Sequence, residues 1–398
     1  MGLKDKTVVL GVSGSIAAYK AVELASQLTQ AGARVEVIMT KAAEEFVTPL
    51  TFRSITGRPV VTDMFDLSSE YSVEHVALAE AAHVVVVAPA TADIIARMAA
   101  GMADDMVACT VLATKAPVII APAMHSAMYQ NEATQENLAT LKKRGFIMVG
   151  PNYGRLASRG VGIGRLVDIN EIVGTIQLVL GRSGDLKGRR VVVTAGGTQE
   201  PVDPVRSLSN RSSGKMGYAL AEAARDRGAD VVLVSAPTSL ARPAGVEAVD
   251  VTTAEEMLNA VKKVVNKADA LIMAAAVADY RPRKASKSKI KREQAASLAL
   301  ELEKTPDILA EVKGKFLKVG FAAETEDLVA NARKKLEKKQ LDLVVANDVT
   351  IEGSGIGADS NQVVIIDRKG KTDKLPLLPK RDVADKILDK IVQLLAKK

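Results

Sequence analysis

Short apolar runs alternate with amphipathic stretches along the first half of the chain. The runs are rich in Val, Ile and Leu, as is typical of strands buried on both faces of a parallel sheet, and they occupy residues 6–10, 34–39, 84–88 and 117–121. Apolar positions with helical spacing lie between and after them, at residues 17–30, 94–100, 106–114, 132–144 and 168–180. This alternation predicts an α/β fold whose parallel sheet is covered by helices on both faces.

The same alternation returns in the second half of the chain. Strands are predicted at residues 189–194, 231–234, 270–275, 318–320 and 343–346, and a β-hairpin at 363–366 and 374–377. Helices are predicted at residues 216–227, 254–266, 325–339 and 382–395. Glycine, serine and charged residues at 182–188 indicate a linker. We therefore expect one α/β domain over residues 1–181 and a second, Rossmann-like domain over 189–398.

Composition narrows the class of protein. The chain has 398 residues, of which 47% are hydrophobic and 25% charged, and it contains neither a signal-peptide pattern nor an apolar run long enough to span a bilayer. A globular, cytoplasmic protein without membrane contact is expected. Its single cysteine, Cys109, lies mid-helix and is expected in the core; it excludes an intrachain disulfide and a cysteine-cluster metal site.

The charge of +7 is concentrated in one region. Residues 281–340 hold 16 Lys and Arg against 9 Asp and Glu. Aromatic residues make up only 3% of the chain, so stacking platforms for nucleic-acid bases are not expected. A basic patch for a small polyanion is the better interpretation.

A long polar loop follows the strand at 189–194. It begins at Gly196-Gly197 and closes on Ser212-Ser213-Gly214-Lys215, where a helix begins. Backbone N–H groups and the helix dipole make such a turn attractive to an anion. The loop is too long for the dinucleotide fingerprint, which argues against a reductase that uses NAD(P)H. An ordinary βα turn is the alternative, but the many polar side chains favour a substrate loop.

A second glycine-rich turn follows the first strand of the chain. Ser13 and Ser15 flank Gly14 directly before a helix, which suits one phosphate group rather than a pyrophosphate. A simple helix cap by Ser15 explains the pattern equally well. The carboxyl ends of the neighbouring predicted strands carry Thr40, the segment 88–93 and the segment 122–125, and ligands of α/β proteins bind at this edge.

Four motifs in the first half resemble the flavin-dependent cysteine decarboxylases, specifically the phosphopantothenoylcysteine decarboxylases. They are residues 11–20, 89–93, 101–105 and 122–129. The resemblance implies a flavodoxin-like domain that forms trimers, with its flavin close to a subunit boundary. It also implies substrate contact by Met124 and His125. The residues implied to hold FMN are Ser13, Gly14, Ser15, Ile16, Thr40, Pro89, Ala90, Thr91 and Asp93.

The resemblance also implies the catalytic residues of this domain, with two departures from the family. His75 matches the catalytic histidine, for which a surface position near a helix start is the alternative. His125 stands where the family has asparagine. Ser158 stands where the family has the cysteine that protonates the enethiol intermediate, and a hydroxyl is a much weaker acid than a thiol. His125, Arg159 or water could supply the proton instead. An active ligase fused to a flavin-bound but catalytically impaired scaffold is therefore the alternative function.

The second half offers candidate nucleotide contacts. Asp279 follows a predicted strand and is placed to meet a ribose or Mg²⁺. Lys289 lies in a basic stretch whose alternative interpretation is a solvated loop. Lys335 and Lys339 share one helix face, and their mutual repulsion favours an anion such as a triphosphate between them.

Most of residues 189–395 resembles the phosphopantothenate–cysteine ligases. The whole chain is thus similar to the bifunctional coenzyme A biosynthesis proteins, in the same domain order. The resemblance implies a homo-oligomer with dimeric ligase domains and trimeric decarboxylase domains, possibly a dodecamer. It further implies a CTP-dependent reaction with Mg²⁺ through an acyl-cytidylate, although the sequence leaves ATP open as the nucleotide.

Residue roles follow from the same resemblance. Lys289 supports formation of the acyl-cytidylate, and Asn210 supports its breakdown by cysteine. Arg206, Ser212 and Lys215 are implied to hold the substrate phosphate. The residues implied to hold CTP are Met273, Ala274, Ala275, Asp279, Pro306, Asp307, Ile308, Phe321, Lys335 and Lys339.

Overall fold

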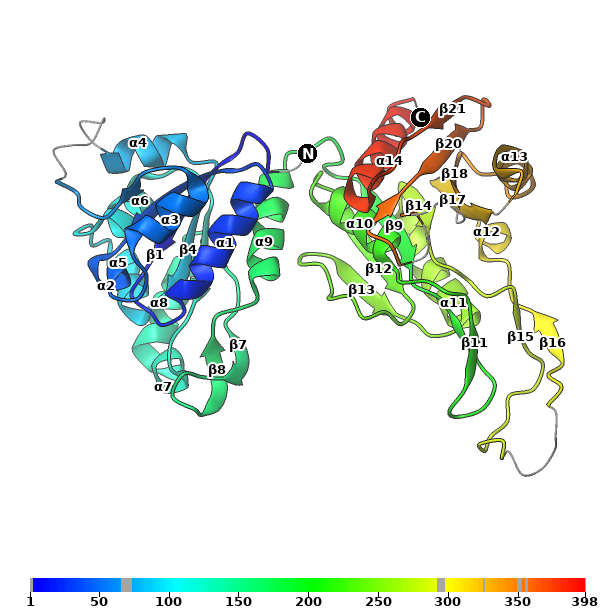
Figure 1. Ribbon diagram of the computed structural model, residues 1–398, viewed down its shortest axis with the longest axis horizontal. Coiled ribbons are helices and arrows are strands. Elements are labelled where there is room, and N and C mark those ends of the chain that lie inside the picture. Colours follow the sequence, from blue (N-terminus) through cyan, green and yellow to red (C-terminus); the bar gives the residue numbers. More distant parts are fainter. Residues whose placement is uncertain are drawn as a thin grey trace. The chain divides into compact units, whose positions relative to one another are not determined.

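The computed structural model describes residues 3–65, 74–291, 298–324, 326–348, 353–354 and 357–397. The chain divides into two compact units, Met1–Leu180 and Gly181–Lys398, and each is an α/β unit built on its own sheet (Figure 1). The expected fold class is confirmed. Within the described part of the chain, no helix combines the length and the apolar character needed to cross a membrane.

The first unit contains a six-stranded parallel sheet. Its strand order is β3-β2-β1-β4-β5-β6, and its central strands are buried along their full length because helices cover both faces. The order reverses between β1 and β4, where α/β folds form a ligand crevice. The strands are β1 (Thr7–Val12), β2 (Arg34–Met39), β3 (Val60–Val61), β4 (Val84–Ala90), β5 (Val118–Pro122) and β6 (Ile147–Met148).

Helices on the two faces of this sheet form two apolar clusters. Helices α1 (Ala18–Gln30), α3 (Pro49–Thr56) and α9 (Ile169–Gly181) contribute to one cluster. The other cluster takes its helical residues from α4 (Glu74–Ala81), α5 (Ala92–Ala100), α6 (Met106–Ala113) and α8 (Glu132–Lys143). The short helices are α2 (Lys41–Glu44) and α7 (Ser126–Gln130). An antiparallel hairpin of β7 (Asn152–Arg155) and β8 (Val161–Arg165), which the apolar pattern did not predict, follows β6.

The second unit repeats this plan in a sheet of eight strands. Its order is β13-β12-β9-β14-β17-β18-β20-β21, with the reversal between β9 and β14. Within this order, the six strands β13, β12, β9, β14, β17 and β18 pair in parallel. Strands β20 and β21 add the predicted antiparallel hairpin at one edge. The strands are β9 (Arg190–Ala195), β12 (Asp230–Ser235), β13 (Glu247–Asp250), β14 (Ala270–Met273), β17 (Leu317–Glu324), β18 (Leu343–Asp348), β20 (Val363–Asp367) and β21 (Thr372–Lys374).

Helices again cover both faces of the second sheet. Helices α10 (Lys215–Arg225) and α14 (Lys380–Leu395) cover one face. The opposite face is covered by α11 (Ala254–Val264), α12 (Ile308–Glu311) and α13 (Leu328–Lys338). A 3₁₀ turn, η1 (Val265–Lys267), extends α11.

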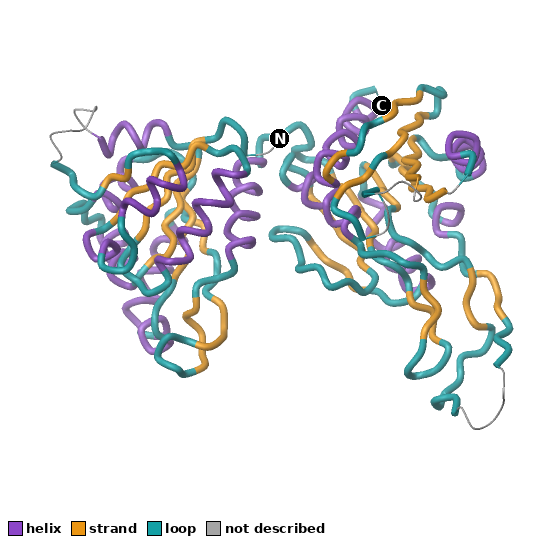
Figure 2. The backbone as a smooth tube through the Cα atoms, viewed as in Figure 1, coloured by secondary structure: helices purple, strands orange, loops and turns teal. Residues whose placement is uncertain are grey.

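In the described part of this unit, three small two-stranded antiparallel sheets complete the fold, and the apolar pattern predicted none of them. They are β10 (Gln199–Pro201) with β11 (Ser207–Ser209), β15 (Tyr280–Pro282) with β16 (Leu302–Lys304), and β19 (Ser360–Asn361) with β22 (Leu378–Pro379). The first two extend as arms away from the large sheet of this unit (Figure 2).

The segment expected to be a linker is packed against the second unit. Leu186 is fully buried, and its N–H donates to the Arg227 carbonyl oxygen at 2.9 Å. Gly184 lies so close to the chain that an added Cβ would stand 2.4 Å from the same oxygen. Residues 182–188 therefore form part of the second unit's surface rather than a loose connection.

A buried ion network fixes the carboxyl end of α10. The side chains of Arg225 and Asp226 are each only 2% exposed and form an ion pair. Arg381 of α14 donates to the second oxygen of Asp226 at 2.7 Å. Removing one partner of such a network leaves an uncompensated buried charge, which costs about 3–5 kcal/mol.

We therefore expect Asp226→Ala to lower the free energy of unfolding of the second unit by about 3–5 kcal/mol. The measurement is a urea titration read by pulse proteolysis, with the fragments of the two units resolved separately. Asp230→Ala is the matched control, because it removes an exposed partner of Arg190 and should cost less than about 1 kcal/mol. Equal losses in the two variants would contradict a stabilising role for the buried network.

Candidate active sites

The first unit has a cavity of about 810 Å³ at the carboxyl edge of its sheet. Loops after β1, β4 and β5 line it together with the β7–β8 hairpin. The sequence-predicted residues that line it are Gly14, Ser15, Ile16, Thr91, Met124, His125 and Ser158. The other residues expected to hold FMN are not part of the described lining: Ser13 follows β1, Thr40 follows β2, Pro89 and Ala90 end β4, and Asp93 lies in the first turn of α5.

The charge of this cavity suits an anion. Among the described residues that line it, none is acidic, whereas Lys20, Arg155 and Arg165 are basic. Burial, and then the neighbouring Arg165, lower the pKa of Lys20. A bound anion would offset this unfavourable positive charge.

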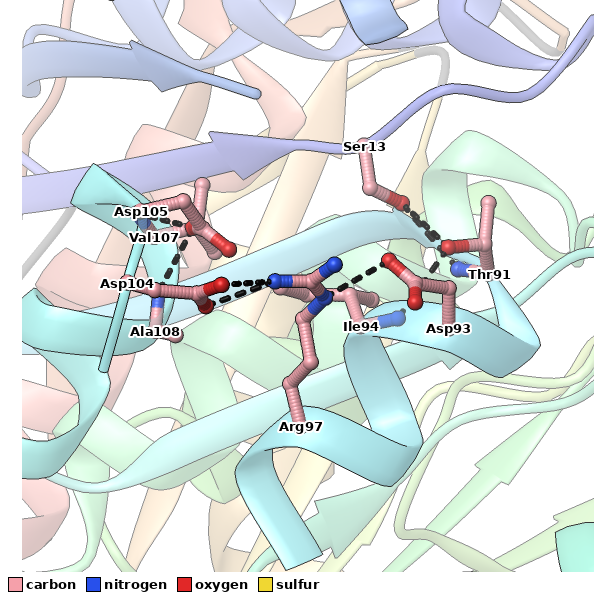
Figure 3. A network of polar contacts seen from close by, with 9 residues as sticks. All are labelled: Ser13, Thr91, Asp93, Ile94, Arg97, Asp104, Asp105, Val107 and Ala108. Carbon is pink, nitrogen blue, oxygen red and sulfur yellow. Dashed lines mark hydrogen bonds and ion pairs between the residues drawn. The ribbon is translucent and has the colours of Figure 1, made fainter. Parts of the chain in front are cut away.

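Ser13 joins two of the loops that line the cavity. Its buried hydroxyl donates to the Pro89 carbonyl oxygen at 2.7 Å and accepts from the Thr91 N–H at 3.0 Å. Figure 3 shows Ser13 pointing at Thr91 across the ends of β1 and β4. The structure therefore gives Ser13 a positioning contact. Ser15 accepts from the Ala17 N–H at 3.2 Å but does not cap α1, because the N-cap position is Ala17 and this helix has no side-chain cap hydrogen bond.

The turn at Gly14 also depends on close packing. A Cβ added there would lie 2.5 Å from the Ala42 Cβ and 2.9 Å from the Ala42 carbonyl carbon. Thr40 lies two residues before Ala42, and its buried hydroxyl oxygen has no hydrogen-bond partner among the residues that the structure describes. A buried polar atom of this kind requires a partner, and a cofactor in the cavity could provide one.

One polar network joins the motif at 89–93 to the motif at 101–105 (Figure 3). Arg97 donates to Asp93 at 2.9 Å and to both carboxylate oxygens of Asp104 at 2.6 Å. The hydrogen bond from Arg97 lowers the pKa of Asp104. Asp105 caps α6 by accepting from the Val107 N–H at 2.8 Å. The resemblance had marked these motifs separately, and the structure shows that they support one another.

His125 lines the cavity and caps a short helix with its ring. Its Nδ1 accepts from the Ala127 N–H at 3.2 Å and caps α7. In the neutral ring the proton then lies on Nε2. Asparagine at this position could make the same pair of interactions, since its amide offers both an acceptor and a donor.

Ser158 lies in the turn of the β7–β8 hairpin, which is tied to the loop of His125. Ser126 donates to the Ile163 carbonyl oxygen at 2.6 Å, and the Met124 N–H donates to the Gly164 carbonyl oxygen at 2.9 Å. Both ties hold the hairpin beside the cavity. Ser158 is exposed at the cavity wall.

Two other candidates of the first unit lie outside this lining. His75 is half-buried on α4 and does not belong to the described residues around the cavity, so its role stays a prediction. Cys109 is buried on α6, and its Sγ donates to the Ala103 carbonyl oxygen at 2.9 Å. Burial raises the pKa of its thiol. The prediction that Cys109 belongs to the core is confirmed.

The second unit has a cavity of about 490 Å³ at the carboxyl edge of its own sheet. It gathers all the residues that the resemblance associated with CTP except Ala274. The structure adds residues that the resemblance did not single out: Lys304, Thr305 and Lys338. Four lysines and two aspartates therefore line this cavity, which again favours an anion.

The two lysines on α13 and at its end have protein partners. Lys335 donates to the Phe321 carbonyl oxygen at 2.7 Å, and Lys339 forms an ion pair with Asp307. Because Asp307 offsets the charge of Lys339, the repulsion expected from their spacing is not by itself evidence for a triphosphate. The positive lining of the whole cavity is the stronger observation.

The long loop after β9 packs closely on the chain after β14. An added Cβ at Gly197 would lie 2.7 Å from the Asn210 carbonyl oxygen, so the loop requires glycine there. Asn210 donates from its side chain to the Val277 carbonyl oxygen at 3.0 Å, and Thr198 accepts from the Ala278 N–H at 2.9 Å. Asn210 is thereby fixed beside the segment that leads to Asp279.

The residues expected to hold the substrate phosphate have contacts within the protein. Ser212 accepts from the Gly214 N–H at 3.3 Å, just before α10. Lys215 contacts Asp359 at 2.6 Å and the Gly357 carbonyl oxygen at 2.9 Å. The guanidinium of Arg206 contacts Asp203 and the Ile290 carbonyl oxygen, while Lys289 is exposed.

Metal-binding side chains are sparse in the second cavity. In the described ranges of the chain, no group of three or more His, Cys, Asp and Glu residues could hold a metal ion. Asp279 and Asp307 are the acidic residues of this cavity. Such a site suits Mg²⁺ only if phosphate groups of a ligand supply further oxygens.

Comparison with known proteins assigns the class of each unit. Residues 2–181 match the family described as flavoprotein, and residues 186–395 match the DNA/pantothenate metabolism flavoprotein C-terminal domain. The protein is therefore a flavoprotein domain joined to a pantothenate-metabolism domain.

Relatives extend over almost the whole chain. A Vibrio cholerae protein is 46% identical over 391 residues (97% of this chain, 98% of that protein), and a Bacillus subtilis protein is 46% identical over 398 residues (98% of each). Both are described as coenzyme A biosynthesis bifunctional protein CoaBC. A crystal structure of the C-terminal domain of such a protein is 42% identical, with a TM-score of 0.47 over 54% of this chain and all of that one.

The chain belongs to the family of bifunctional coenzyme A biosynthesis proteins, as the motifs predicted. It is a bifunctional enzyme of coenzyme A biosynthesis. The comparisons give no support to a catalytically impaired first unit.

The packing at Gly14 yields a test of the first cavity. Gly14→Ala should displace the Ser13–Ile16 turn, because the new methyl group would collide with Ala42. We expect at least about a tenfold loss of flavin affinity, since a shift that breaks one hydrogen bond to a charged group costs about 1.5–3 kcal/mol. Flavin content and the fluorescence titration of the purified protein measure this. Gly160→Ala is the control, because its Cβ would meet only Ser158 Oγ at 3.8 Å. Normal flavin binding by Gly14→Ala would contradict this assignment of the turn.

Proposed function

We propose that the second unit ligates cysteine to 4′-phosphopantothenate with CTP, and that the first unit uses FMN to decarboxylate 4′-phosphopantothenoylcysteine to 4′-phosphopantetheine. The observation that supports this most directly is that some of the motif residues, including most of those expected to hold CTP, line two positively charged cavities, one in each unit. Every substrate named here except cysteine carries a phosphate, which such cavities favour.

The ligation begins with activation of a carboxylate. A carboxylate oxygen of 4′-phosphopantothenate attacks the α-phosphorus of CTP, the bond to pyrophosphate breaks, and an acyl-cytidylate forms. Charge then develops on the leaving pyrophosphate, and cations stabilise it. We assign this stabilising role to Lys289, and we assign Lys335 and Lys339 to binding the nucleotide. Phosphate oxygens would replace Asp307 as the partner of Lys339.

The second step consumes the acyl-cytidylate. The amine of cysteine attacks the acyl carbonyl carbon, the bond to CMP breaks, and an amide forms. The Asn210 amide nitrogen already donates to Val277, so its side-chain oxygen is left to accept from the incoming amine. This arrangement supports an orienting role for Asn210.

Mg²⁺ fits this site as an ion shared with the nucleotide. We assign Asp279 as its protein ligand, with phosphate oxygens completing the coordination. Arg206, Ser212 and Lys215 are assigned to the phosphate of 4′-phosphopantothenate, near the amino end of α10. Lys215 would exchange Asp359 for that phosphate.

The first cavity fits FMN by charge and by its available polar atoms. Ser15 and Ile16 at the amino end of α1 would hold the single phosphate, and the Thr40 hydroxyl would gain the partner that it otherwise lacks among the described residues. The Pro89–Asp93 loop, held by Ser13 and Arg97, would support the ring. When bound, FMN supplies two-electron oxidation and reduction of the cysteine end.

The protein's own residues orient the substrate and move protons. The Nε2–H of His125 would hold the substrate carboxylate, Met124 would contact the substrate beside it, and His75 is assigned as the catalytic base. The β7–β8 hairpin would cover the substrate and exclude water. Ser158, His125, Arg159 or water would protonate the enethiol that remains after carbon dioxide leaves.

Apolar side chains support a homo-oligomer, with trimers of the first unit and dimers of the second. Ile16, Tyr19 and Phe46 at the first cavity are 57%, 61% and 48% exposed. Val205 and Leu302, on the projecting arms of the second unit, are 67% and 43% exposed. Exposed apolar groups of this kind favour contact with another copy of the chain. A cytoplasmic location is part of the same proposal.

Ser158 gives a test of the decarboxylase chemistry. Ser158→Cys should increase the yield of 4′-phosphopantetheine while carbon dioxide release stays unchanged, because a thiol is a better proton donor than a hydroxyl. Parallel measurement of the two products checks this. Cys109→Ser, which removes the buried native thiol, should change neither product. An unchanged yield with Ser158→Cys would contradict a protonation step at this position.

Lys289 and Asn210 give a test of the ligase chemistry. Lys289→Ala should reduce pyrophosphate release by at least about a hundredfold, a loss typical of removing one group that stabilises transition-state charge. Asn210→Ala should accumulate acyl-cytidylate instead. Quenched-flow analysis of pyrophosphate and CMP separates these effects. Lys287→Ala, an exposed lysine on the same loop, should behave as the unmodified enzyme. Comparable loss in Lys287→Ala would argue for general charge rather than a specific role of Lys289.

A further inference from the structure

Asp203 forms an unusually complete set of hydrogen bonds for a loop residue. It lies between β10 and β11, and its side chain is fully buried. Oδ1 accepts from the backbone N–H groups of Val205 and Arg206, each at 2.8 Å. Oδ2 accepts from the Arg206 side chain at 2.9 and 2.5 Å and from the Ile290 N–H at 3.1 Å. The carboxylate therefore connects its own loop to residue 290, far away in the sequence.

The loop that carries Lys289 is held at two points. At Ile290, Asp203 accepts from the N–H while Arg206 donates to the carbonyl oxygen at 2.7 Å. Four residues earlier, the Ser286 N–H donates to the Val202 carbonyl oxygen at 2.9 Å. The backbone of Lys289 is thus fixed on both sides, while its side chain stays exposed.

The same carboxylate fixes the start of the strand that leads to Asn210. Oδ1 closes the turn at residues 203–206, from which β11 runs directly to Asn210. Asn210 in turn contacts Val277. The spacing between the exposed amine of Lys289 and the amide of Asn210 depends on this turn.

We propose that Asp203 is a positioning residue of the ligase reaction, which holds the Lys289 loop in register with the loop of Asn210. Because its carboxylate is buried, Asp203 acts through Arg206 and the backbone of Ile290 rather than by touching substrate. The inference rests on the proposed role of Lys289 in forming the acyl-cytidylate. It assigns to Asp203 the task of keeping that lysine where the phosphates of CTP arrive.

The charge of Asp203 is essential to this arrangement. All its contacts are donors, and an ionised acceptor forms hydrogen bonds about twice as strong as a neutral one. The hydrogen bond from Arg206, together with backbone N–H groups, keeps the pKa of Asp203 well below its ordinary value. In Asp203→Asn, the side chain keeps its shape but offers one amide NH₂, which cannot accept from Ile290 or Arg206.

Asp203→Asn in the full-length holoenzyme tests the proposal. Limited trypsin digestion, read by mass spectrometry, should show about ten- to a hundredfold faster cleavage after Lys287 and Lys289, since one or two hydrogen bonds to a charged group are lost. Pyrophosphate release should fall by a similar factor. The rate at which cysteine captures chemically prepared acyl-cytidylate should change by less than about threefold. A merely structural defect would slow this step as well.

Glu301→Gln is the matched control. It removes an exposed carboxylate that pairs with Arg283 on the same loop, at 2.6 Å, and it should change neither cleavage nor pyrophosphate release. A cooperative urea unfolding transition of the second unit, read by pulse proteolysis, verifies that each variant is folded. If Asp203→Asn does not fold, Arg206→Gln serves instead, because it removes the donor to the Ile290 carbonyl oxygen and should also accelerate cleavage at this loop.

The two readouts separate failure of this inference from failure of the proposed function. Unchanged cleavage in a folded variant would overturn the inference, whatever the activity. Faster cleavage with normal pyrophosphate release would overturn the positioning role. Loss of pyrophosphate release in Lys289→Ala but not in Asp203→Asn would leave the proposed function standing and remove only this inference. Normal release in Lys289→Ala itself would instead remove the proposed function of that lysine.

Discussion

Both candidate sites depend on one geometric constraint: in a parallel sheet, the carboxyl ends of all strands lie at the same edge. The six parallel strands of each unit follow the same order, with the reversal between β1 and β4 in the first and between β9 and β14 in the second. At that reversal the loops diverge and leave a crevice. The loops are then held to each other by short polar contacts, Ser13 to Pro89 in one unit and Asn210 to Val277 in the other.

Charge and close packing turn these crevices into anion sites. In the described lining of both cavities, basic side chains outnumber acidic ones. Glycine at positions 14 and 197 lets a loop approach other backbone more closely than any side chain would permit. A bifunctional enzyme of coenzyme A biosynthesis needs two such sites, because each of its proposed half-reactions handles a phosphorylated substrate.

The sequence predicted the strands well and the connections poorly, for a physical reason. Apolar runs such as Val84–Ala90 identify buried strands because burial on both faces leaves no polar positions. The hairpins β7–β8 and β10–β11 are largely exposed, so their sequences carry no regular spacing of apolar residues that would predict a strand. Motif resemblance found Lys339 and Asp203's neighbour Arg206, but the ion pair of Lys339 with Asp307 and the buried carboxylate of Asp203 depend on contacts between distant loops. Such contacts leave no local signal in one sequence.

The most direct test of the central claim follows one carbon atom through both units. The purified protein is supplied with 4′-phosphopantothenate, CTP, Mg²⁺ and cysteine labelled with heavy carbon in its carboxyl group, and the products are identified by mass spectrometry. The account predicts a transient labelled amide, then labelled carbon dioxide and unlabelled 4′-phosphopantetheine. Labelled amide that accumulates without carbon dioxide, or no amide at all, would contradict it.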